Sequence, residues 1–420
     1  MKPLQRAAII AVGSELLTAS RIDTDSLLIT EQLNLLGIEV ASKGIVGDDH
    51  DELAVALSTA LTRVDIVVCS GGLGPTDDDV TRDVVARVLA RPLAEDDRIT
   101  EHIRARFAAR SLQMPEINRR QAMVPAGARI IENANGTAPG LWIEEGDRVV
   151  VLLPGPPREL KPMLARLAAG WLSERAPGLS LVRRVLRIVG RTESHTEEAV
   201  RPLYPEWAQA AVPIAVTILA SLGQIELHLS ARARSRSEAE AALDVASSQV
   251  VERLGMDVYS RDGTSMEQVV GNLLVEHNWR IAVAESCTGG LITSRLTDVP
   301  GSSRYVERGV VAYTNESKVA LLGVASALID EHGAVSEPVA IAMAEGIRMR
   351  AATNVGIGVT GIAGPGGGTP QKPVGTVAVA AAAADLVRSR LFRFIGDREH
   401  VKFQASQAAL DMVRRMLLAS

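Results

Sequence analysis

Residues 280–297 read Arg-Ile-Ala-Val-Ala-Glu-Ser-Cys-Thr-Gly-Gly-Leu-Ile-Thr-Ser-Arg-Leu-Thr, and this stretch decides the fold of its part of the chain. Arg280–Ala284 has the short aliphatic run of a buried strand, and Leu291–Thr297 has the apolar spacing of a helix. Gly289 and Gly290 between them allow a tight turn with exposed main-chain N–H groups. A strand that passes through such a turn into a helix predicts an α/β domain.

The same alternation of strands and helices extends along the first and last parts of the chain. The expected strands are Ala7–Val12, Ile38–Lys43, Asp65–Cys69, Val149–Leu153, Gly309–Tyr313, Val355–Thr360 and Gly375–Ala384. The expected helices are Ile22–Leu36, Asp51–Leu61, Val80–Leu89 and Met266–His277. Val377 and Val379 favour a strand over a helix for the alanine-rich run that follows them. This order predicts parallel sheets with helices on their faces.

Between these parts, residues 178–260 have the pattern of a small α+β module. Leu181–Val189 and Gln224–Ala231 alternate like strands, and Glu238–Leu254 has the spacing of one amphipathic helix. His195 and His228 are isolated in the sequence, so a surface or core role is favoured over metal binding. We expect three domains, at residues 1–172, 173–262 and 263–420.

The composition excludes several classes of protein. Hydrophobic residues make up 47% of the 420 residues and aromatic residues only 3%, so the cores must be largely aliphatic. The formal net charge of −5, without a basic stripe, argues against direct nucleic-acid binding. Two cysteines cannot form a disulfide framework, and no apolar run is long enough for a signal peptide or a membrane span. We therefore expect a soluble cytoplasmic protein with no membrane partner.

Ser286 lies in the tight turn after the strand Arg280–Ala284, where a nucleophile would face the positive end of the next helix. The N–H groups of that turn would then provide an oxyanion hole. A plain turn, or a phosphate cradle without chemistry, explains the same residues about equally well.

A serine nucleophile needs a base, and no histidine lies in a comparable turn. Tyr313 and Lys318 follow an expected strand, five positions apart. A lysine buried beside a serine can act as the base if burial lowers its pKa, and a tyrosine can relay the proton or orient the lysine. A solvated surface lysine remains the alternative.

The glycine-rich segment Thr360–Gly368 follows another expected strand and includes Gly361 and Gly364. Ligands of α/β sheets bind at the carboxyl ends of strands, so this segment is interpreted as a substrate-binding loop. A flexible surface connection is less favoured because Lys372–Gly375 leads directly into the next strand.

The N-terminal part contains a second glycine-rich loop, which starts at Gly71, Gly72 and Gly74 and continues through Thr76 to three aspartates. Glycines let phosphate approach the main chain, and adjacent carboxylates would then require a cation such as Mg²⁺. The alternative is that the aspartates cap the helix Val80–Leu89. Two further loops, 13–17 and 154–159, carry Glu15 and Glu159.

The C-terminal motifs resemble the nicotinamide-mononucleotide deamidase domain of CinA proteins. The matching residues lie within 265–420 and include 286–290, 300–303, 313–318, 333–336 and the loop from Thr360. The resemblance implies hydrolysis of the carboxamide of nicotinamide mononucleotide, without a cofactor, by Ser286 with Tyr313 and Lys318 as activating partners. The substrate-binding positions would be Thr288, Gly289, Gly290, Thr360, Gly361, Gly364 and Arg398.

Residues 5–170 resemble the N-terminal domain of CinA, which is similar to the molybdopterin-binding fold. The resemblance implies metal-dependent cleavage of ADP-ribose in a three-layer domain. It assigns Asp78 and Asp79 to the metal, with Glu15 and Glu159 as secondary ligands, and the loop from Gly71 to Thr76 to the substrate. Asp25 departs from the asparagine that is typical of its position, and Asp83 replaces a usual glutamate.

The resemblance also implies a homodimer, and it leaves two other functions open. The first is a molybdopterin-type binding or transfer protein, based on the N-terminal fold alone. The second is a non-enzymatic partner in competence or recombination, which the acidic composition does not favour for direct DNA contact.

Overall fold

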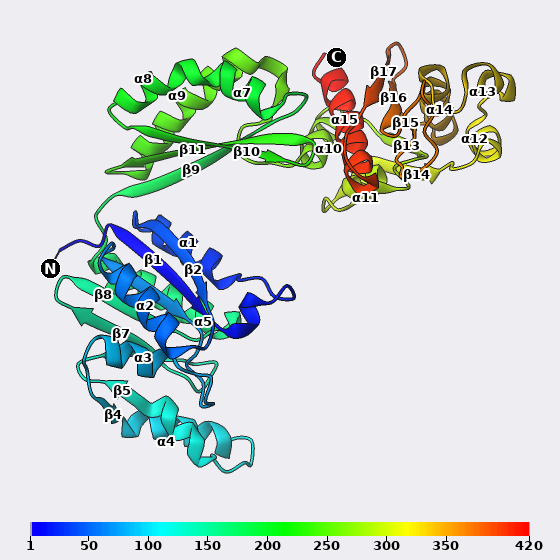
Figure 1. The fold of residues 1–420 in the computed structure, drawn as a ribbon. Helices are drawn as coiled ribbons and strands as arrows, with labels where there is room; N and C mark the ends of the chain where they lie inside the picture. The colour runs from blue at the N-terminus through cyan, green and yellow to red at the C-terminus, as the bar shows by residue number, and fades with distance from the viewer. Residues whose placement is uncertain (1, 420) are drawn as a thin grey trace. The chain divides into compact units, whose positions relative to one another are not determined.

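A computed structural model describes residues 2–419 of the chain (Figure 1). The chain forms two compact units, Met1–Val182 with Ala231–Ala241 and Arg183–Ser230 with Ala242–Ser420. Within residues 2–419, none of the helices combines the length and the apolar character that a bilayer span requires.

The first unit is built on a six-stranded sheet in the order β2-β1-β3-β8-β7-β6. Its strands are β1 (Arg6–Val12), β2 (Glu39–Val46), β3 (Ile66–Ser70), β6 (Arg129–Ile131), β7 (Gly140–Glu145) and β8 (Arg148–Leu153), with β4 (Leu93–Glu95) and β5 (Met123–Pro125) as a separate pair. Its helices are α1 (Asp25–Leu35), α2 (His50–Leu61), α3 (Thr81–Val88), α4 (Asp97–Ala108), α5 (Pro157–Ala169) and α6 (Trp171–Glu174), with short 3-10 turns at Ser14–Leu17 and Glu116–Ala122.

The prediction of a parallel sheet is confirmed for the four strands that were expected in this unit, and the sheet gains two strands that were not expected. Strands β2, β1, β3 and β8 are parallel, whereas β7 and β6 run antiparallel. The reason lies in the link between β7 and β8, where Glu145 pairs with Arg148 across Gly146 and Asp147. A two-residue turn can join only antiparallel strands, and Gly146 has the positive φ (60°) that such turns favour.

The sheet of the first unit is covered on both faces, which gives the three layers expected from the sequence. On one face, Ile9, Val68 and Val151 pack with residues of α1 and α5. On the other face, Ala8, Val67 and Val150 pack with residues of α2 and α3. Strand residues thus alternate between two aliphatic cores.

The middle segment is the expected α+β module, and its sheet has the order β10-β11-β9-β12. Its elements are β9 (Ser180–Ile188), α7 (Glu193–Val200), α8 (Tyr204–Gln209), β10 (Ile214–Ser221), β11 (Gln224–Ala233), α9 (Arg236–Leu254) and β12 (Val258–Ser260). Leu227 and Leu229 of β11 are fully buried, as are Leu243 and Val250 of α9.

The C-terminal segment forms a five-stranded sheet in the order β14-β13-β15-β16-β17. Its strands are β13 (Ile281–Glu285), β14 (Val306–Val311), β15 (Val355–Gly361), β16 (Thr376–Ala382) and β17 (Val387–Arg393). Its helices are α10 (Met266–Glu276), α11 (Leu291–Thr297), α12 (Asn315–Leu322), α13 (Ser326–His332), α14 (Glu337–Ala351) and α15 (Arg398–Leu417). Strands β14, β13 and β15 are parallel, as predicted. The prediction is wrong for β16, the expected strand Gly375–Ala384, which runs antiparallel to β15 because the link 362–375 contains no crossover helix. Strand β17 is also antiparallel.

The alanine-rich run is a buried strand, as expected, and its composition follows from the two faces of the sheet. Val377 and Val379 of β16 face the core that contains α10, α11 and α15. Ala378 and Ala380 face Ala340 and Ala344 of α14. Small residues on both sides let α14 lie close to the sheet.

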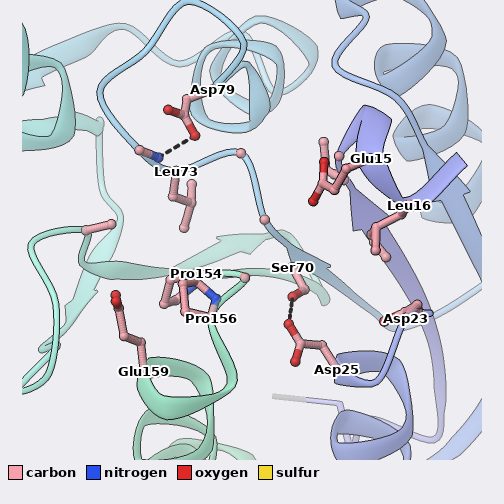
Figure 2. Close-up of a pocket in the computed structure, with 18 of the residues that line it drawn as sticks. Glu15, Leu16, Asp23, Asp25, Ser70, Leu73, Asp79, Pro154, Pro156 and Glu159 are labelled. Carbon is pink, nitrogen blue, oxygen red and sulfur yellow. Dashed lines mark hydrogen bonds between the residues drawn. The ribbon is translucent and has the colours of Figure 1, made fainter. Parts of the chain in front are cut away.

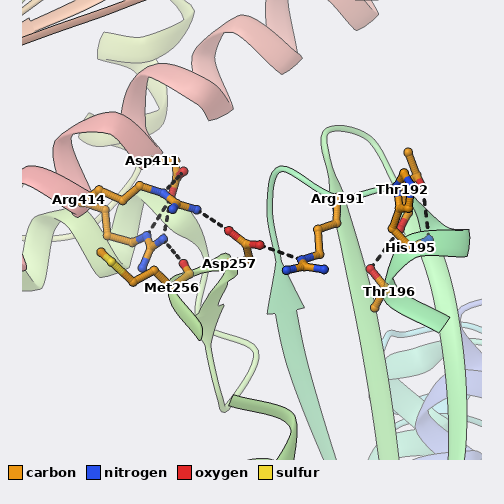
Figure 3. A network of polar contacts seen from close by, with 9 residues as sticks. Arg191, Thr192, His195, Thr196, Met256, Asp257, Asp411 and Arg414 are labelled. Carbon is orange, nitrogen blue, oxygen red and sulfur yellow. Dashed lines mark hydrogen bonds and ion pairs between the residues drawn. The ribbon is translucent and has the colours of Figure 1, made fainter. Parts of the chain in front are cut away.

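Within the second unit, a network of charged side chains links the middle module to α15 (Figure 3). Asp257 accepts hydrogen bonds from Arg191 Nε at 2.6 Å and from Arg415 at 2.8 Å. Asp411 of α15 accepts from both Arg414 and Arg415, and Arg414 also donates to the carbonyl of Met256. This network ties β12 and the end of β9 to the C-terminal helix.

Candidate active sites

Ser286 immediately follows β13 and is held at the carboxyl end of the sheet. Its main-chain N–H donates to the carbonyl of Val359 in β15 at 2.9 Å, which extends the pairing of the two strands by one residue. The serine is 7% exposed. Its hydroxyl is therefore fixed on a rigid strand end instead of a mobile loop.

Lys318 reaches this serine from α12. Its Nζ lies 3.2 Å from Ser286 Oγ and also donates to the carbonyls of Ala312 and Tyr313, each at 3.2 Å. The side chain is 2% exposed, and burial lowers the pKa of its amine. A lysine with a lowered pKa in contact with a serine hydroxyl has the geometry and the protonation tendency of a general base.

Tyr313 also reaches the site, but with its main chain. Its carbonyl lies 3.5 Å from Ser286 Oγ, whereas its phenol is turned outward and accepts a hydrogen bond from Arg398 at 2.9 Å. The tyrosine is 56% exposed and lies beyond Val311, where β14 ends. The structure thus gives the phenol a partner other than the serine and the lysine that the sequence suggested.

The expected oxyanion hole at the start of α11 is occupied by the protein itself. The fully buried carboxylate of Glu285 accepts hydrogen bonds from the N–H groups of Gly290, Ile292 and Thr293 at 3.0, 3.1 and 2.9 Å. This expectation is therefore wrong for those amides, because an acidic side chain caps them. In the sequence, the acidic residue Glu285 directly before Ser286 could have indicated this capping.

The next two residues, Cys287 and Thr288, are both buried, and burial affects their thiol and hydroxyl groups differently. Burial raises the pKa of the Cys287 thiol to about 12, so this cysteine is not a thiolate nucleophile at neutral pH. Thr288 is completely buried, and its hydroxyl oxygen has no hydrogen-bond partner within residues 2–419. Such a hydroxyl is a donor without a partner, two residues after the serine in the sequence.

The remaining predicted binding residues gather at the same sheet edge. Thr360, near the end of β15, donates its hydroxyl hydrogen to the carbonyl of Ala334 at 2.8 Å. Gly361 ends β15, and Gly364 follows in the loop, where its carbonyl accepts from Arg398 at 2.7 Å. Arg398, the first residue of α15, therefore links the glycine-rich loop to the Tyr313 phenol.

In the N-terminal unit, the loop from Gly71 to Asp79 follows β3. The carboxylate of Asp79 accepts from the N–H of Gly74 at 2.6 Å and from the N–H and hydroxyl of Thr76 at 2.9 and 2.7 Å. A Cβ atom at Gly74 would lie 2.3 Å from this carboxylate, so a side chain there would displace Asp79 from its hydrogen bonds. Asp79, a predicted metal ligand, thus braces its own loop, while Asp78 is exposed.

This loop borders a cavity of about 630 Å³ that the predicted acids share (Figure 2). Seven acidic side chains and one arginine line it: Glu15, Asp23, Asp25, Asp48, Asp78, Asp79 and Glu159, with Arg21. Gly71, Gly72 and Gly74 also line it. Loops after β1, β3 and β8 thus meet at the carboxyl edge of the parallel strands, as expected for a ligand site in an α/β sheet.

Hard oxygen ligands of this kind suit Mg²⁺, although the acids do not form a closed cage. No three His, Cys, Asp or Glu groups within residues 2–419 are arranged to hold a metal ion. The Glu159 carboxylate already accepts a hydrogen bond from the Asn133 amide at 2.8 Å, and the Asp79 carboxylate accepts one from the N–H of Gly74 in its own loop. Asp78 and Glu15 remain as carboxylates that face the cavity. Mg²⁺ commonly binds through one or two carboxylates together with water and substrate phosphates, so the donor set is compatible with it.

Sequence reasoning did not assign Asp25, Asp48 or Ser70 to the site, and all three line this cavity. The Asp48 carboxylate accepts a hydrogen bond from the N–H of Ser14 at 2.8 Å, and the N–H of Asp48 donates to the Ser14 hydroxyl at 3.0 Å. This pair joins the loop after β1 to the loop after β2. Asp25 accepts from the Ser70 hydroxyl at 3.1 Å, and its other carboxylate oxygen is buried without a partner within residues 2–419. Burial raises the pKa of Asp25 to about 6. In the sequence, Asp25 was noticeable only because an asparagine is typical of its position.

Family models and curated relatives match nearly all of the chain. "Probable molybdopterin binding domain" matches residues 8–174, "Damage-inducible protein CinA KH domain" residues 183–260, and "CinA C-terminal domain" residues 263–417. A CinA-like protein of Koribacter versatilis is 46% identical over 98% of this chain and 100% of its own length. A CinA-like protein of Acidobacterium capsulatum is also 46% identical, with the same two coverages.

Proposed function

Because this chain belongs to the CinA family, we propose that its C-terminal domain is a serine amidohydrolase that acts on nicotinamide mononucleotide. The observation that carries the proposal is the 3.2 Å contact between Lys318 Nζ and Ser286 Oγ inside a buried site. Burial disfavours the charged form of a lysine, so a buried lysine is expected where its neutral form is used as a base.

The proposed reaction proceeds in two halves. The neutral amine of Lys318 takes the hydroxyl proton of Ser286 while Oγ bonds to the carboxamide carbon. The carbon–nitrogen bond then breaks, Lys318 returns the proton to the leaving nitrogen, and ammonia departs. Water next adds to the serine ester, Lys318 takes its proton and returns it to Oγ, and the carboxylic acid leaves.

The buried hydroxyl of Thr288 is the proposed donor to the oxyanion in both halves. Its oxygen lacks a partner within residues 2–419, whereas the amides of Gly290, Ile292 and Thr293 already serve Glu285. A donor without a competing partner can act at the developing charge without reorganisation.

Arg398 is the proposed contact for the phosphate of the nucleotide. Its guanidinium joins the Tyr313 phenol to the glycine-rich loop, so a bound phosphate would meet a charge that is already oriented. In this proposal Tyr313 activates the serine indirectly, through its carbonyl contacts with Lys318 and Ser286, and positions Arg398 with its phenol.

The test is to trap the ester. Wild-type protein mixed with nicotinamide mononucleotide and quenched within a turnover should carry a nicotinoyl-nucleotide adduct on Ser286, detected by peptide mass spectrometry. An adduct at another residue, or ammonia release with no adduct and full activity in Ser286→Ala, would rule out the serine mechanism.

We also propose metal-dependent cleavage of ADP-ribose in the N-terminal cavity, since acids and glycines line the same cavity. Asp78 and Glu15 would hold a divalent ion, which supplies charge neutralisation for the diphosphate. The main chain at Gly71, Gly72 and Gly74 would receive the phosphate oxygens. Release of AMP from ADP-ribose, measured with Mg²⁺ and after EDTA, tests this activity separately from ammonia release.

A further inference from the structure

A cavity of about 560 Å³ lies in the second unit, where the middle module meets the C-terminal segment, and neither proposed activity uses it. Four parts of the chain line it: the residues after β9, the turn before β12, the strand β17 and the C-terminal half of α15. The volume is within the range of small-molecule sites. Ser286 and Lys318 do not line this cavity, so it is separate from the proposed amidase site.

The charged network of Figure 3 borders this cavity, and it contains more guanidinium groups than carboxylates. Asp257 and Asp411 line the cavity, and both accept hydrogen bonds from Arg415, at 2.8 and 2.7 Å. Arg191 donates to Asp257 at 2.6 Å, and Arg414 donates to Asp411 at 2.7 Å. Three guanidinium groups thus share two carboxylates, so the network already carries one positive charge in excess.

Two arginines of β17 add further positive charge to the lining. Arg388 is exposed, and within residues 2–419 its guanidinium forms no hydrogen bond, ion pair or ring contact. Arg390 contacts only an aromatic ring, that of Phe392, whose centroid lies 4.9 Å from the guanidinium carbon. Both guanidinium groups can therefore bind an anion without giving up an existing ion pair.

Apolar side chains line the same cavity. Val189 is 5% exposed, and Phe392 and Met412 are partly buried where they pack against the C-terminal core. The ring of Phe392 stacks on that of Phe394, with 5.2 Å between the two centroids, so its position is well defined. An aromatic ring and a thioether both make favourable contacts with a flat group.

We propose that this cavity binds a phosphate carried on a flat apolar group, which is the chemistry of a nucleoside monophosphate. Arg388 and Arg390 bind the phosphate, because the guanidinium fork matches phosphate oxygens in both geometry and charge. The ring of the ligand packs against Phe392. Such a ligand contacts the middle module and the C-terminal segment together, so it stabilises their junction. The site is independent of both activities proposed above, because neither uses its residues.

The test uses a variant of one lining arginine and a matched control. Arg388→Gln removes a guanidinium group from the cavity. Arg393 is exposed on the opposite face of the same strand, forms no side-chain contact within residues 2–419 and does not line the cavity, so Arg393→Gln removes the same charge elsewhere. Both full-length variants should melt like the wild type and release ammonia from nicotinamide mononucleotide at the wild-type rate.

AMP is titrated calorimetrically into each full-length protein. EDTA is present, because it removes the divalent ion that a phosphate would need in the acidic N-terminal cavity. We expect the wild type to bind AMP and Arg388→Gln to bind it about tenfold or more weakly, as expected for the loss of one charge-assisted hydrogen bond. Arg393→Gln should bind AMP like the wild type.

Two further probes test the class of ligand. Adenosine lacks the phosphate and inorganic phosphate lacks the ring, so each should bind the wild type about tenfold or more weakly than AMP does. No AMP binding to the wild type, unchanged binding in Arg388→Gln, or equal weakening in both variants would overturn the site. Adenosine or inorganic phosphate that binds as tightly as AMP would overturn the proposed class of ligand.

Discussion

Asp25→Asn is expected to stabilise the N-terminal unit at neutral and alkaline pH. The carboxyl is 9% exposed, and burial is the largest cause of its raised pKa, with Asp23 adding to the shift and Ser70 and Lys161 opposing it. The pKa rises from 3.8 to about 6, and each unit corresponds to about 1.4 kcal/mol, so ionised Asp25 costs up to about 3 kcal/mol.

The sign of the pH dependence follows from the direction of this shift. A raised pKa means that the native state binds the proton more tightly, so the stabilisation is complete below pH 3.8 and is lost as the pH rises through about 6. Asparagine keeps an acceptor for the Ser70 hydroxyl but carries no charge. The gain from Asp25→Asn should therefore be small at pH 4 and approach 3 kcal/mol, as an order of magnitude, at pH 8.

Urea unfolding of the full chain, followed by tryptophan fluorescence at pH 4 and pH 8, measures this difference. Glu31→Gln provides the control, because it removes an exposed charge from the same helix. Equal stability of Asp25→Asn and wild type at pH 8, or a gain of the same size at both pH values, would refute the assignment of a buried, costly carboxylate.

Three further predictions concern the two sites. Lys318→Arg keeps the positive charge but has no usable base, so ammonia release should fall by about 100-fold or more. In the wild type, the rate of ammonia release should rise with pH through a pKa below 10.5. A rate that is independent of pH from 6 to 10 would contradict the role of Lys318 as the base. Asp79→Ala removes the brace of the Gly74 loop, so AMP release from ADP-ribose should be lost while ammonia release is unchanged; loss of both would deny two separate sites. Arg398→Ala should raise KM for nicotinamide mononucleotide by about tenfold or more with a smaller change in kcat, and it should leave KM for the phosphate-free nucleoside unaffected.

The strands that carry both sites could be predicted from short aliphatic runs followed by glycine. β1, β3, β8, β13 and β15 all lie within a residue or so of their expected bounds. Such runs are local features, because a strand buried on both faces has an almost continuous apolar sequence. The tight turns at their ends were visible for the same local reason.

The direction and the edges of the sheets depended on longer-range packing. The antiparallel strands β7 and β17 have no sequence pattern that distinguishes them from parallel ones, and β17 alternates charged and apolar residues like a surface segment. Helices α12 to α14 are short or rich in alanine, so their periodicity is weak. Their positions follow from the cores that they cover.

Within the sites, sequence spacing identified residues but not the direction of their side chains. Lys318 and Ser286 meet because α12 begins directly after the segment that follows β14, and that contact was expected. The outward turn of the Tyr313 phenol and the capping of α11 by Glu285 depend on competing hydrogen bonds that only the folded chain defines. Asp79 similarly found its partners in its own loop.

Ammonia release from nicotinamide mononucleotide, measured for the wild type and Ser286→Ala with and without EDTA, tests the central claim most directly. The account predicts that the wild type releases ammonia equally in both conditions and that a folded Ser286→Ala variant releases none. Release that EDTA abolishes, or that persists in Ser286→Ala, would contradict a metal-free serine amidase at the contact between Ser286 and Lys318.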